Sequence, residues 1–184
     1  MKVIAEPALI PVQDVKAHWA YTEIIGAHSS PAYARYAGVD ALRAKRGATV
    51  PFGALSEPER AALVVAWHGV RAHYFERYFA TVLGYRVAHW TRPQLLSVRV
   101  PPRLDTTQSH YPTLLHFFST QANHPDDPRN AEKEGITIQP DGEPLILGLH
   151  NSEPIIGDGL HRARTFQMSA LPTTIQVYVP VPVE

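Results

Sequence analysis

The prolines of this 184-residue chain are unevenly distributed, and their distribution limits where long helices can form. Twelve of the seventeen prolines lie at position 93 or later, whereas the long uninterrupted periodic stretches lie before it. Proline in a helix interior removes a hydrogen bond and clashes with the preceding turn. The sequence therefore predicts an α+β fold, with a mainly helical N-terminal region at 1–90 and a small mixed β-sheet in 91–184. The two regions could pack as one core or form separate subdomains.

Two helices are expected in the first half. Residues 31–46 begin with proline and end at Gly47, which are common start and stop signals of a helix. Residues 56–83 begin with an S-x-x-E capping box. They also carry apolar residues at spacings of three or four, so this helix must bury one face.

Beyond residue 84 the pattern changes to short β-branched or alternating runs that are separated by turn residues. A further helix is expected at 109–122, an exposed loop at 123–135 and a short helix at 160–169. The expected strands are 85–90, 95–100, 136–138, 144–150, 153–157 and 173–181.

The chain has no cysteine, which excludes a disulfide scaffold, a thiolate zinc site and a cysteine nucleophile. No apolar run approaches the roughly 20 residues that a membrane-spanning helix needs. Glu6, Pro7 and Pro11 interrupt the apolar start that a signal peptide requires. We therefore expect a cytoplasmic protein that does not insert into a membrane.

Positive and negative charges balance overall but are separated along the chain. Residues 35–103 hold eleven Arg or Lys against four acids, a net charge of +7, and residues 104–158 hold two against nine, a net charge of −7. These segments could form solvated faces or attract each other. Alternatively, the basic segment could dock onto DNA or an acidic protein, because arginine binds phosphate and carboxylate groups well.

The segment that points to chemistry is 153–165, where an apolar strand leads through two glycines directly into a helix. Gly157 and Gly159 allow a close approach of the backbone and positive φ angles. The free N–H groups and the dipole of a helix N-terminus favour an anion such as phosphate. His161 and Arg162 add hydrogen-bond donors at the same place.

Asp158 cannot bind phosphate by itself. It would instead hold a divalent metal, orient a nucleophile, accept a proton or cap the helix. The purely structural alternative is that Asp158 is a helix cap, that the glycines form a tight turn and that the basic residues are solvated. The segment is neither a Walker A loop nor a dinucleotide-binding fingerprint, because it lacks the glycine spacing of both.

The five residues Asp158-Gly159-Leu160-His161-Arg162 resemble the ParB/sulfiredoxin superfamily, whose members carry an acidic-glycine turn and a basic pair at a helix start. The similarity extends over about residues 95–180, where 95–100 looks like the first strand of that core. It implies that ATP, ADP or CTP phosphates are held around Gly157 to Leu160, together with His161 and Arg162. Arg99, at the end of the expected first strand, would make a second phosphate contact or a surface ion pair.

The sequence also departs from this superfamily. Leu160 stands where sulfiredoxins have their catalytic cysteine, so sulfinic-acid reduction is excluded. The chain offers no room after the core for the helix-turn-helix of partitioning proteins, so centromere recognition is not expected. The arrangement looks more like plasmid fertility-inhibition, or oncogenic-suppression, proteins. That resemblance implies ATP hydrolysis and metal-dependent DNA cleavage, which block conjugative DNA transfer.

Two functions therefore remain open. In the first, the chain is a nucleotide-binding phosphohydrolase or nuclease with Asp158, His161 and Arg162 as catalytic residues. Asp158 would position Mg²⁺ or water, and one of the acids on neighbouring hairpin segments would join it. Those acids are Asp141, Glu143 and Glu153. In the second, the chain is a non-enzymatic module whose basic segment binds DNA or a conjugative type IV secretion component.

Overall fold

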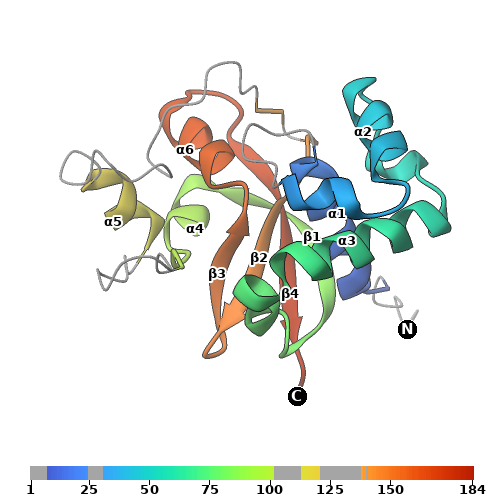
Figure 1. Cartoon of the computed structure of the whole chain (residues 1–184). Helices are drawn as coiled ribbons and strands as arrows, with labels where there is room; N and C mark the ends of the chain where they lie inside the picture. Colours follow the sequence, from blue (N-terminus) through green and yellow to red (C-terminus); the bar gives the residue numbers. More distant parts are fainter. Residues whose placement is uncertain (1–7, 25–30, 102–112, 121–137, 140) are drawn as a thin grey trace, which may run out of the picture. The chain divides into compact units, whose positions relative to one another are not determined.

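The computed structural model describes residues 8–24, 31–101, 113–120, 138–139 and 141–184 (Figure 1). The chain divides into two compact units. The helical unit comprises Met1–Arg77 with Leu83–Arg86, and the sheet unit comprises Tyr78–Val82 with Val87–Glu184. The fold is α+β with a mixed four-stranded sheet. Within the described residues, no helix has both the length and the apolar character needed to cross a membrane.

The helical unit is built around two helices that pack against each other, α1 and α3. The side chains of Trp19 and Trp67 are both buried, and their ring centroids lie 5.6 Å apart. The helices and 3-10 turns up to residue 78 are α1 (Val12–Glu23), η1 (Pro31–Arg35), α2 (Val39–Gly47), η2 (Phe52–Ala54), α3 (Glu57–Phe75) and η3 (Glu76–Tyr78).

Both helices expected in this region form, but their limits differ from the prediction. The stretch 31–46 is divided into η1 and α2, because Gly38 adopts a left-handed conformation with φ of 82° and begins a new helix. The helix expected at 56–83 ends at Phe75, and a strand starts at Val82. The apolar spacing continues past that end because Tyr78 and Phe79 are buried in the turn that follows.

The interior of the helical unit contains a carboxylate that several donors surround. Glu23 accepts hydrogen bonds from Trp19 Nε1 at 2.7 Å, from the Tyr33 hydroxyl at 3.1 Å and from Arg71 Nε at 3.0 Å. Its side chain is 17% exposed. Burial, followed by the adjacent Glu23 carboxylate, raises the pKa of Tyr33 well above its ordinary value of 10.

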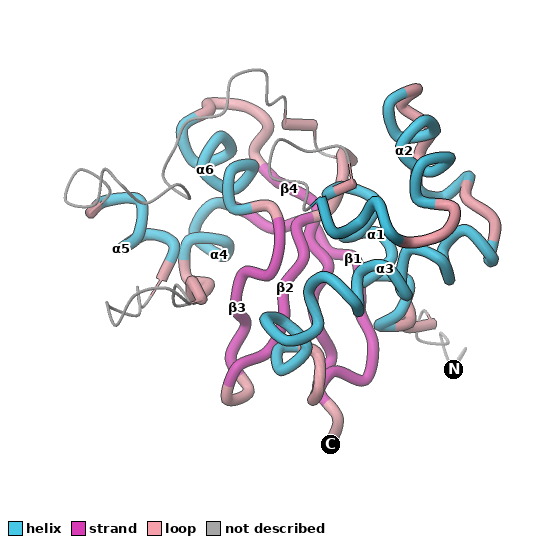
Figure 2. The backbone as a smooth tube through the Cα atoms, viewed as in Figure 1, coloured by secondary structure: helices cyan, strands magenta, loops and turns pink. Residues whose placement is uncertain are grey.

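The strands of the sheet lie in the order β1-β4-β2-β3, and Leu83–Arg86 of β1 belong to the helical unit. Strands β2 and β3 form an antiparallel hairpin, and β2 and β4 run parallel. Asn151 and Ser152 connect the hairpin with φ angles of 52° and 64°, which suits a tight two-residue turn (Figure 2). The strands are β1 (Val82–Thr91), β2 (Leu145–His150), β3 (Glu153–Asp158) and β4 (Thr174–Pro182).

Three helices supply the rest of the core of this unit: α4 (Arg92–Leu96), α5 (Leu114–Ser119) and α6 (Leu160–Met168). Their buried residues, such as Leu95 and Phe166, join Leu145 and Val177 of the sheet in one apolar cluster. Burial of such side chains contributes about 25 cal/mol for each Å² of apolar surface.

The strand expected at 95–100 is wrong. Residues 92–96 form α4 instead, because Thr91 and Gln94 make a capping box and Pro93 lies in the first turn, where its missing N–H costs little. Only Arg99 takes part in strand-like pairing, through an isolated parallel bridge to Ile155.

Most other expected elements of the second half agree with the structure where it describes them. The strands expected at 144–150, 153–157 and 173–181 and the helix expected at 160–169 correspond to β2, β3, β4 and α6. Helix α5 is shorter than the helix expected at 109–122: Thr113 before it is extended and Ser119 is its last residue, while 109–112 and 121–122 lie outside the described residues. The expected loop 123–135 and most of the expected strand 136–138 also lie outside them.

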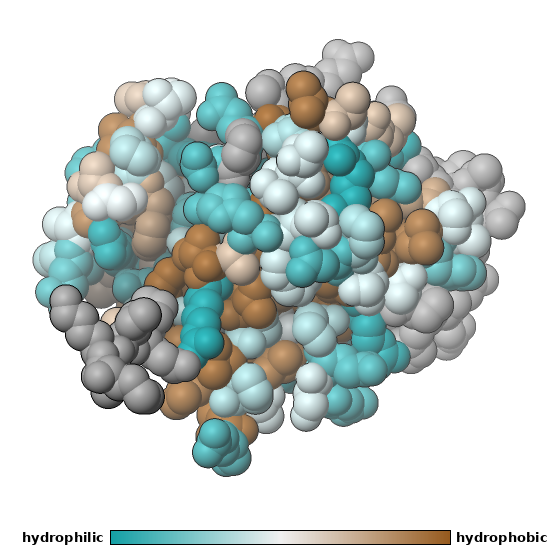
Figure 3. Space-filling model, turned by 180° about the vertical axis from the view of Figure 1, so that it is seen from behind, coloured by the Kyte–Doolittle hydropathy of each residue, from teal (hydrophilic) through white to brown (hydrophobic). Residues whose placement is uncertain are grey.

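Hydrophobic side chains are also present on the surface. The space-filling view from behind shows hydrophobic atoms among hydrophilic ones (Figure 3). Isolated apolar residues on a surface are normal for a folded protein. The large exposed hydrophobic residues are Val65, Leu83, Val87, Leu115, Met168, Leu171 and Val183.

Candidate functional site

The turn between β3 and α6 is determined by one glycine. Gly159 follows the last residue of β3, has a φ of 93° and precedes the first residue of α6. A Cβ atom at this position would lie only 2.3 Å from Cδ2 of the buried Leu145. Glycine is therefore required here both by the backbone conformation and by the lack of space.

Arg162 connects the first turn of α6 to the two segments beside it. Its Nη2 donates to Asp158 Oδ2 at 3.0 Å, and its Nη1 donates to the carbonyl oxygens of Glu143 at 2.6 Å and Pro144 at 3.3 Å. Nη1 also lies 3.9 Å from the Glu143 carboxylate. The Arg162 side chain is only 18% exposed. The guanidinium thus contacts the chain itself through both terminal nitrogens.

Asp158 serves as the partner of this guanidinium, and Gly159 rather than Asp158 is the residue that caps α6. Among the described residues, no group of three or more His, Asp or Glu side chains could hold a metal ion. The carboxylates of Asp158 and Glu143 both have the positive charge of Arg162 beside them. A cation at these two carboxylates would therefore compete with the positive charge of Arg162.

The other residues predicted to bind phosphate lie along the same short segment. Gly157 is the penultimate residue of β3, and Leu160 and His161 begin α6. All three residues are half-buried. The first amide in the hydrogen-bond ladder of α6 is that of Ala163, which donates to the Gly159 carbonyl at 2.8 Å. The amides before it belong to the positive end of the helix dipole.

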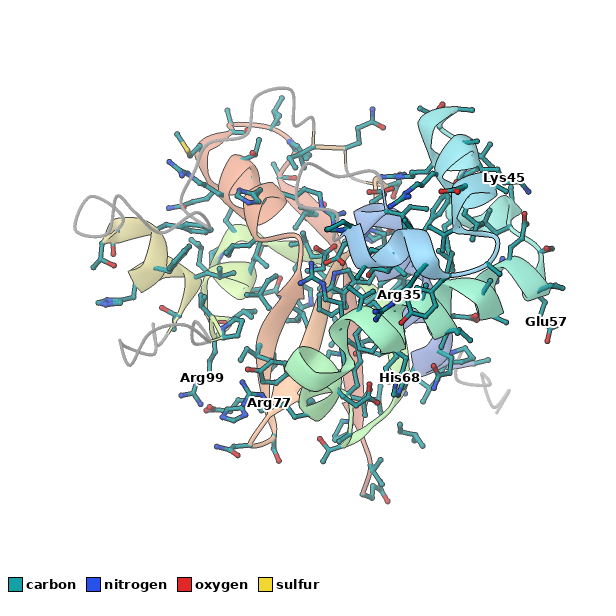
Figure 4. The ribbon with its side chains drawn as sticks, in the orientation of Figure 1. Arg35, Lys45, Glu57, His68, Arg77 and Arg99 are labelled. Atoms are coloured by element: carbon teal, nitrogen blue, oxygen red, sulfur yellow. The ribbon has the colours of Figure 1, made fainter. Side chains whose placement is uncertain are left out.

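The structure does not bring Arg99 to this turn. The Arg99 guanidinium forms an ion pair with Glu153, the first residue of β3. The turn follows Asp158, five residues further along the strand, which is about 16 Å at about 3.3 Å per residue. Figure 4 shows Arg99 toward the end of the sheet that carries the β2–β3 turn, whereas α6 lies toward the other end. Of the two predicted roles of Arg99, a phosphate contact or a surface ion pair, the geometry therefore favours the ion pair.

The three acids expected near the site are distributed differently. Glu143 lies beside Arg162, as described above. Glu153 is the partner of Arg99, and Asp141 is paired with His89, with Asp141 Oδ1 3.0 Å from His89 Nε2. Glu143 is therefore the acid that the fold places next to Asp158.

The basic segment 35–103 contacts its own chain extensively. Arg92, for example, lies over the Phe166 ring at 4.5 Å and donates to the carbonyls of Phe166, Ser169 and Pro172. These carbonyls lie at or just after the end of α6, where helical carbonyls lack partners. Arg103 lies outside the described residues. Other basic residues of the segment also make hydrogen bonds, ion pairs or contacts with aromatic rings of the same chain. They are Arg35, Arg43, Lys45, Arg46, Arg60, Arg71 and Arg99.

Sequence reasoning missed the roles of the Glu143 and Pro144 carbonyls, because backbone acceptors leave no trace in residue types. The pairing of Asp158 with Arg162 did have a signal. The two opposite charges stand four residues apart in the sequence, although Asp158 ends β3 and only Arg162 lies on α6, so the rule for pairs on one helix does not cover them.

Comparisons with family models, with curated proteins and with solved structures found no match to this chain.

Proposed function

We propose that this protein is a nucleotide-binding phosphohydrolase of the ParB/sulfiredoxin-like type, with its phosphate site at the β3–α6 turn. The observation that supports it most is the path of the chain: β3 leads through Gly159, at a φ of 93°, directly into α6. A strand, a glycine turn and a helix start are the arrangement in which backbone amides bind phosphate. His161 lies in the first turn of that helix.

The chemistry would use few groups. The amides at the start of α6 would bind the phosphate oxygens and stabilise the charge that develops on them. Water would attack the terminal phosphorus, and the bond to the bridging oxygen would break. Protonated His161 would give its proton to that leaving oxygen, because histidine can exchange a proton near neutral pH. No step is assigned to Mg²⁺, since Asp158 is paired with Arg162.

The resemblance of Asp158-Gly159-Leu160-His161-Arg162 supports ATP or ADP as the nucleotide. It also supports ATPase or DNase activity directed at conjugative DNA, with DNA or a type IV secretion component as partner. The docking alternative receives less support. Most of the basic residues of 35–103 contact carbonyls, carboxylates or rings of their own chain, and a docking surface would have to break these contacts.

The proposal is tested by titrating the purified protein with ATP, ADP and CTP, with and without Mg²⁺, and by measuring phosphate release. We expect ATP or ADP to bind. His161→Ala should reduce phosphate release by about 100-fold while the dissociation constant changes less than about threefold, because general acid catalysis typically contributes 10²–10⁴-fold.

His89→Ala is the matched control, because His89 is an exposed histidine of the same unit that pairs with Asp141 instead. This variant should release phosphate at the wild-type rate. Failure of the wild-type protein to bind any of the three nucleotides would contradict the proposal. Equal loss of activity in His161→Ala and His89→Ala would contradict the assigned role of His161.

A further inference from the structure

The contacts of Arg162 join three separate segments of the sheet unit. Its own helix is α6, Asp158 ends β3, and the carbonyls of Glu143 and Pro144 precede β2. Strands β2 and β3 are also hydrogen-bonded to each other, and Asp158 is opposite Ile146 in that pairing. One guanidinium therefore fixes the start of α6 to the hairpin that precedes it.

The packing around Gly159 is adapted to this guanidinium. A Cβ atom at Gly159 would lie 3.1 Å from Arg162 Nη2 and 3.3 Å from Arg162 Nε. The missing side chain thus leaves the space that the guanidinium fills. A planar guanidinium with several fixed donors can satisfy carbonyl and carboxylate oxygens at once, which an ammonium group cannot do with the same geometry.

The local charge does not favour a direct contact between Arg162 and phosphate. The positive charge of Arg162 lies beside the carboxylates of Asp158 and Glu143, so the group of three has a net charge of −1 when all are ionised. To bind phosphate, Arg162 would have to release partners that already match its donors. An opposite charge that is already paired attracts a ligand much less than an unpaired one does.

We propose that Arg162 is a positioning residue of the phosphate site, and that it holds the first turn of α6 in place without contacting the phosphate. This inference rests on the proposed nucleotide-binding function and deepens it. Phosphate recognition then falls to the backbone amides of Leu160 and His161, at the start of α6. Asp158 is a positioning residue as well, because its carboxylate orients the Arg162 guanidinium.

Asp158→Asn distinguishes the two roles by the sign of its effect on ADP binding. If Arg162 contacted phosphate, removal of the Asp158 charge would release the guanidinium, reduce repulsion and tighten binding. If Arg162 is a positioning residue, the same substitution loosens the turn and weakens binding. We expect the dissociation constant for ADP to rise about fivefold to tenfold in Asp158→Asn, and by at least as much in Arg162→Lys.

Glu153→Gln is the matched control. It removes the same type of arginine–carboxylate pair, that of Arg99, at the other end of β3. It should leave the dissociation constant for ADP unchanged within about twofold. Tighter binding of ADP by Asp158→Asn would overturn the proposal.

Amide hydrogen exchange of the protein without nucleotide provides a second, independent measurement. The Ala163 amide bonds to the Gly159 carbonyl and reports on the first turn of α6. We expect its exchange to accelerate about tenfold in Asp158→Asn and Arg162→Lys, and to stay unchanged in Glu153→Gln. Unchanged exchange in all three variants would refute the positioning role even if ADP binds. Accelerated exchange in a protein that binds no nucleotide would preserve the positioning of the turn and refute the proposed function.

Discussion

The helical unit and the sheet unit place charge in their interiors in opposite ways. In the helical unit the central group is an anion: the Glu23 carboxylate accepts from Trp19, Tyr33 and Arg71. In the sheet unit the central groups are cations, and they serve the two ends of α6, Arg162 near its start and Arg92 near its end.

The partners differ in kind as well. Glu23 is matched by a formal charge, that of Arg71, which comes from a different helix. Arg92 is matched by three backbone carbonyls, which carry only partial charges but have fixed directions. We therefore expect the helical unit to depend on the charge of Glu23, and the end of α6 in the sheet unit to depend on the shape of the Arg92 guanidinium.

The largest effect is expected for Glu23→Ala, which leaves Arg71 with a half-buried charge and no carboxylate. Breaking such a pair should destabilise the protein by about 3–4 kcal/mol, measured by chemical denaturation. Glu23→Gln keeps the size of the side chain and should still lose most of this stability, because the charge is what is missing. Glu57→Ala, an exposed position of the same unit, should change stability little. If Glu23→Gln lost less than about 1 kcal/mol of stability, the helical unit would not depend on the charge of Glu23.

An intermediate effect is expected for Arg92. Arg92→Ala removes three hydrogen bonds and the contact with the Phe166 ring, and should cost about 2–3 kcal/mol by chemical denaturation, as for hydrogen bonds of charged groups. Arg92→Lys keeps the charge but loses the fork of donors, and should cost nearly as much. If Arg92→Lys were as stable as the wild type, charge rather than shape would also govern the contacts at the end of α6.

The smallest effect is expected at the surface, in the pH dependence of the helical unit. A hydrogen bond from Lys45, followed by those from Ser56, lowers the pKa of Glu59 from its ordinary value of 4.5 to about 2. A carboxylate with a lowered pKa stabilises the fold above the unfolded pKa, and this contribution is lost as the pH falls from about 4.5 through 2.

Melting temperatures between pH 6 and pH 2 test this expectation. The difference between wild type and Glu59→Gln should be present at pH 6 and should shrink toward pH 2. Glu57→Gln removes a neighbouring charge outside the capping box and should show no comparable convergence. If the difference in melting temperature between wild type and Glu59→Gln stayed constant over this range, the charge of Glu59 would not contribute to stability.

Elements with local signals could be predicted from the sequence. Glu59 makes its half of the expected capping box, because the Ser56 amide donates to Glu59 Oε2 at 2.9 Å. The β2–β3 hairpin and the path from β3 into α6 were also predicted, because turn residues and glycines act over a few positions.

Three features were predicted wrongly or missed, because local sequence patterns were absent or pointed to a different element. Helix α1 (Val12–Glu23) was not predicted, since it begins after Pro11 without a side-chain cap. Residues 95–100 alternate like a strand, but the capping box of Thr91 and Gln94 starts a helix there first. The spacing of Tyr78 and Phe79 continues the stripe of α3, although both side chains are buried beyond its end.

The sequence by itself determined the α+β class, the strands of the hairpin and the position of the turn that carries Asp158, Gly159, His161 and Arg162. Only the tertiary structure decided how these side chains are used. It paired Arg99 with Glu153, away from the turn, and directed Arg162 to Asp158 and to the carbonyls before β2. The physical reason is that conformational preferences act between near neighbours, whereas the partner of a long charged side chain is chosen by whichever acceptors the fold brings within about 3 Å of it.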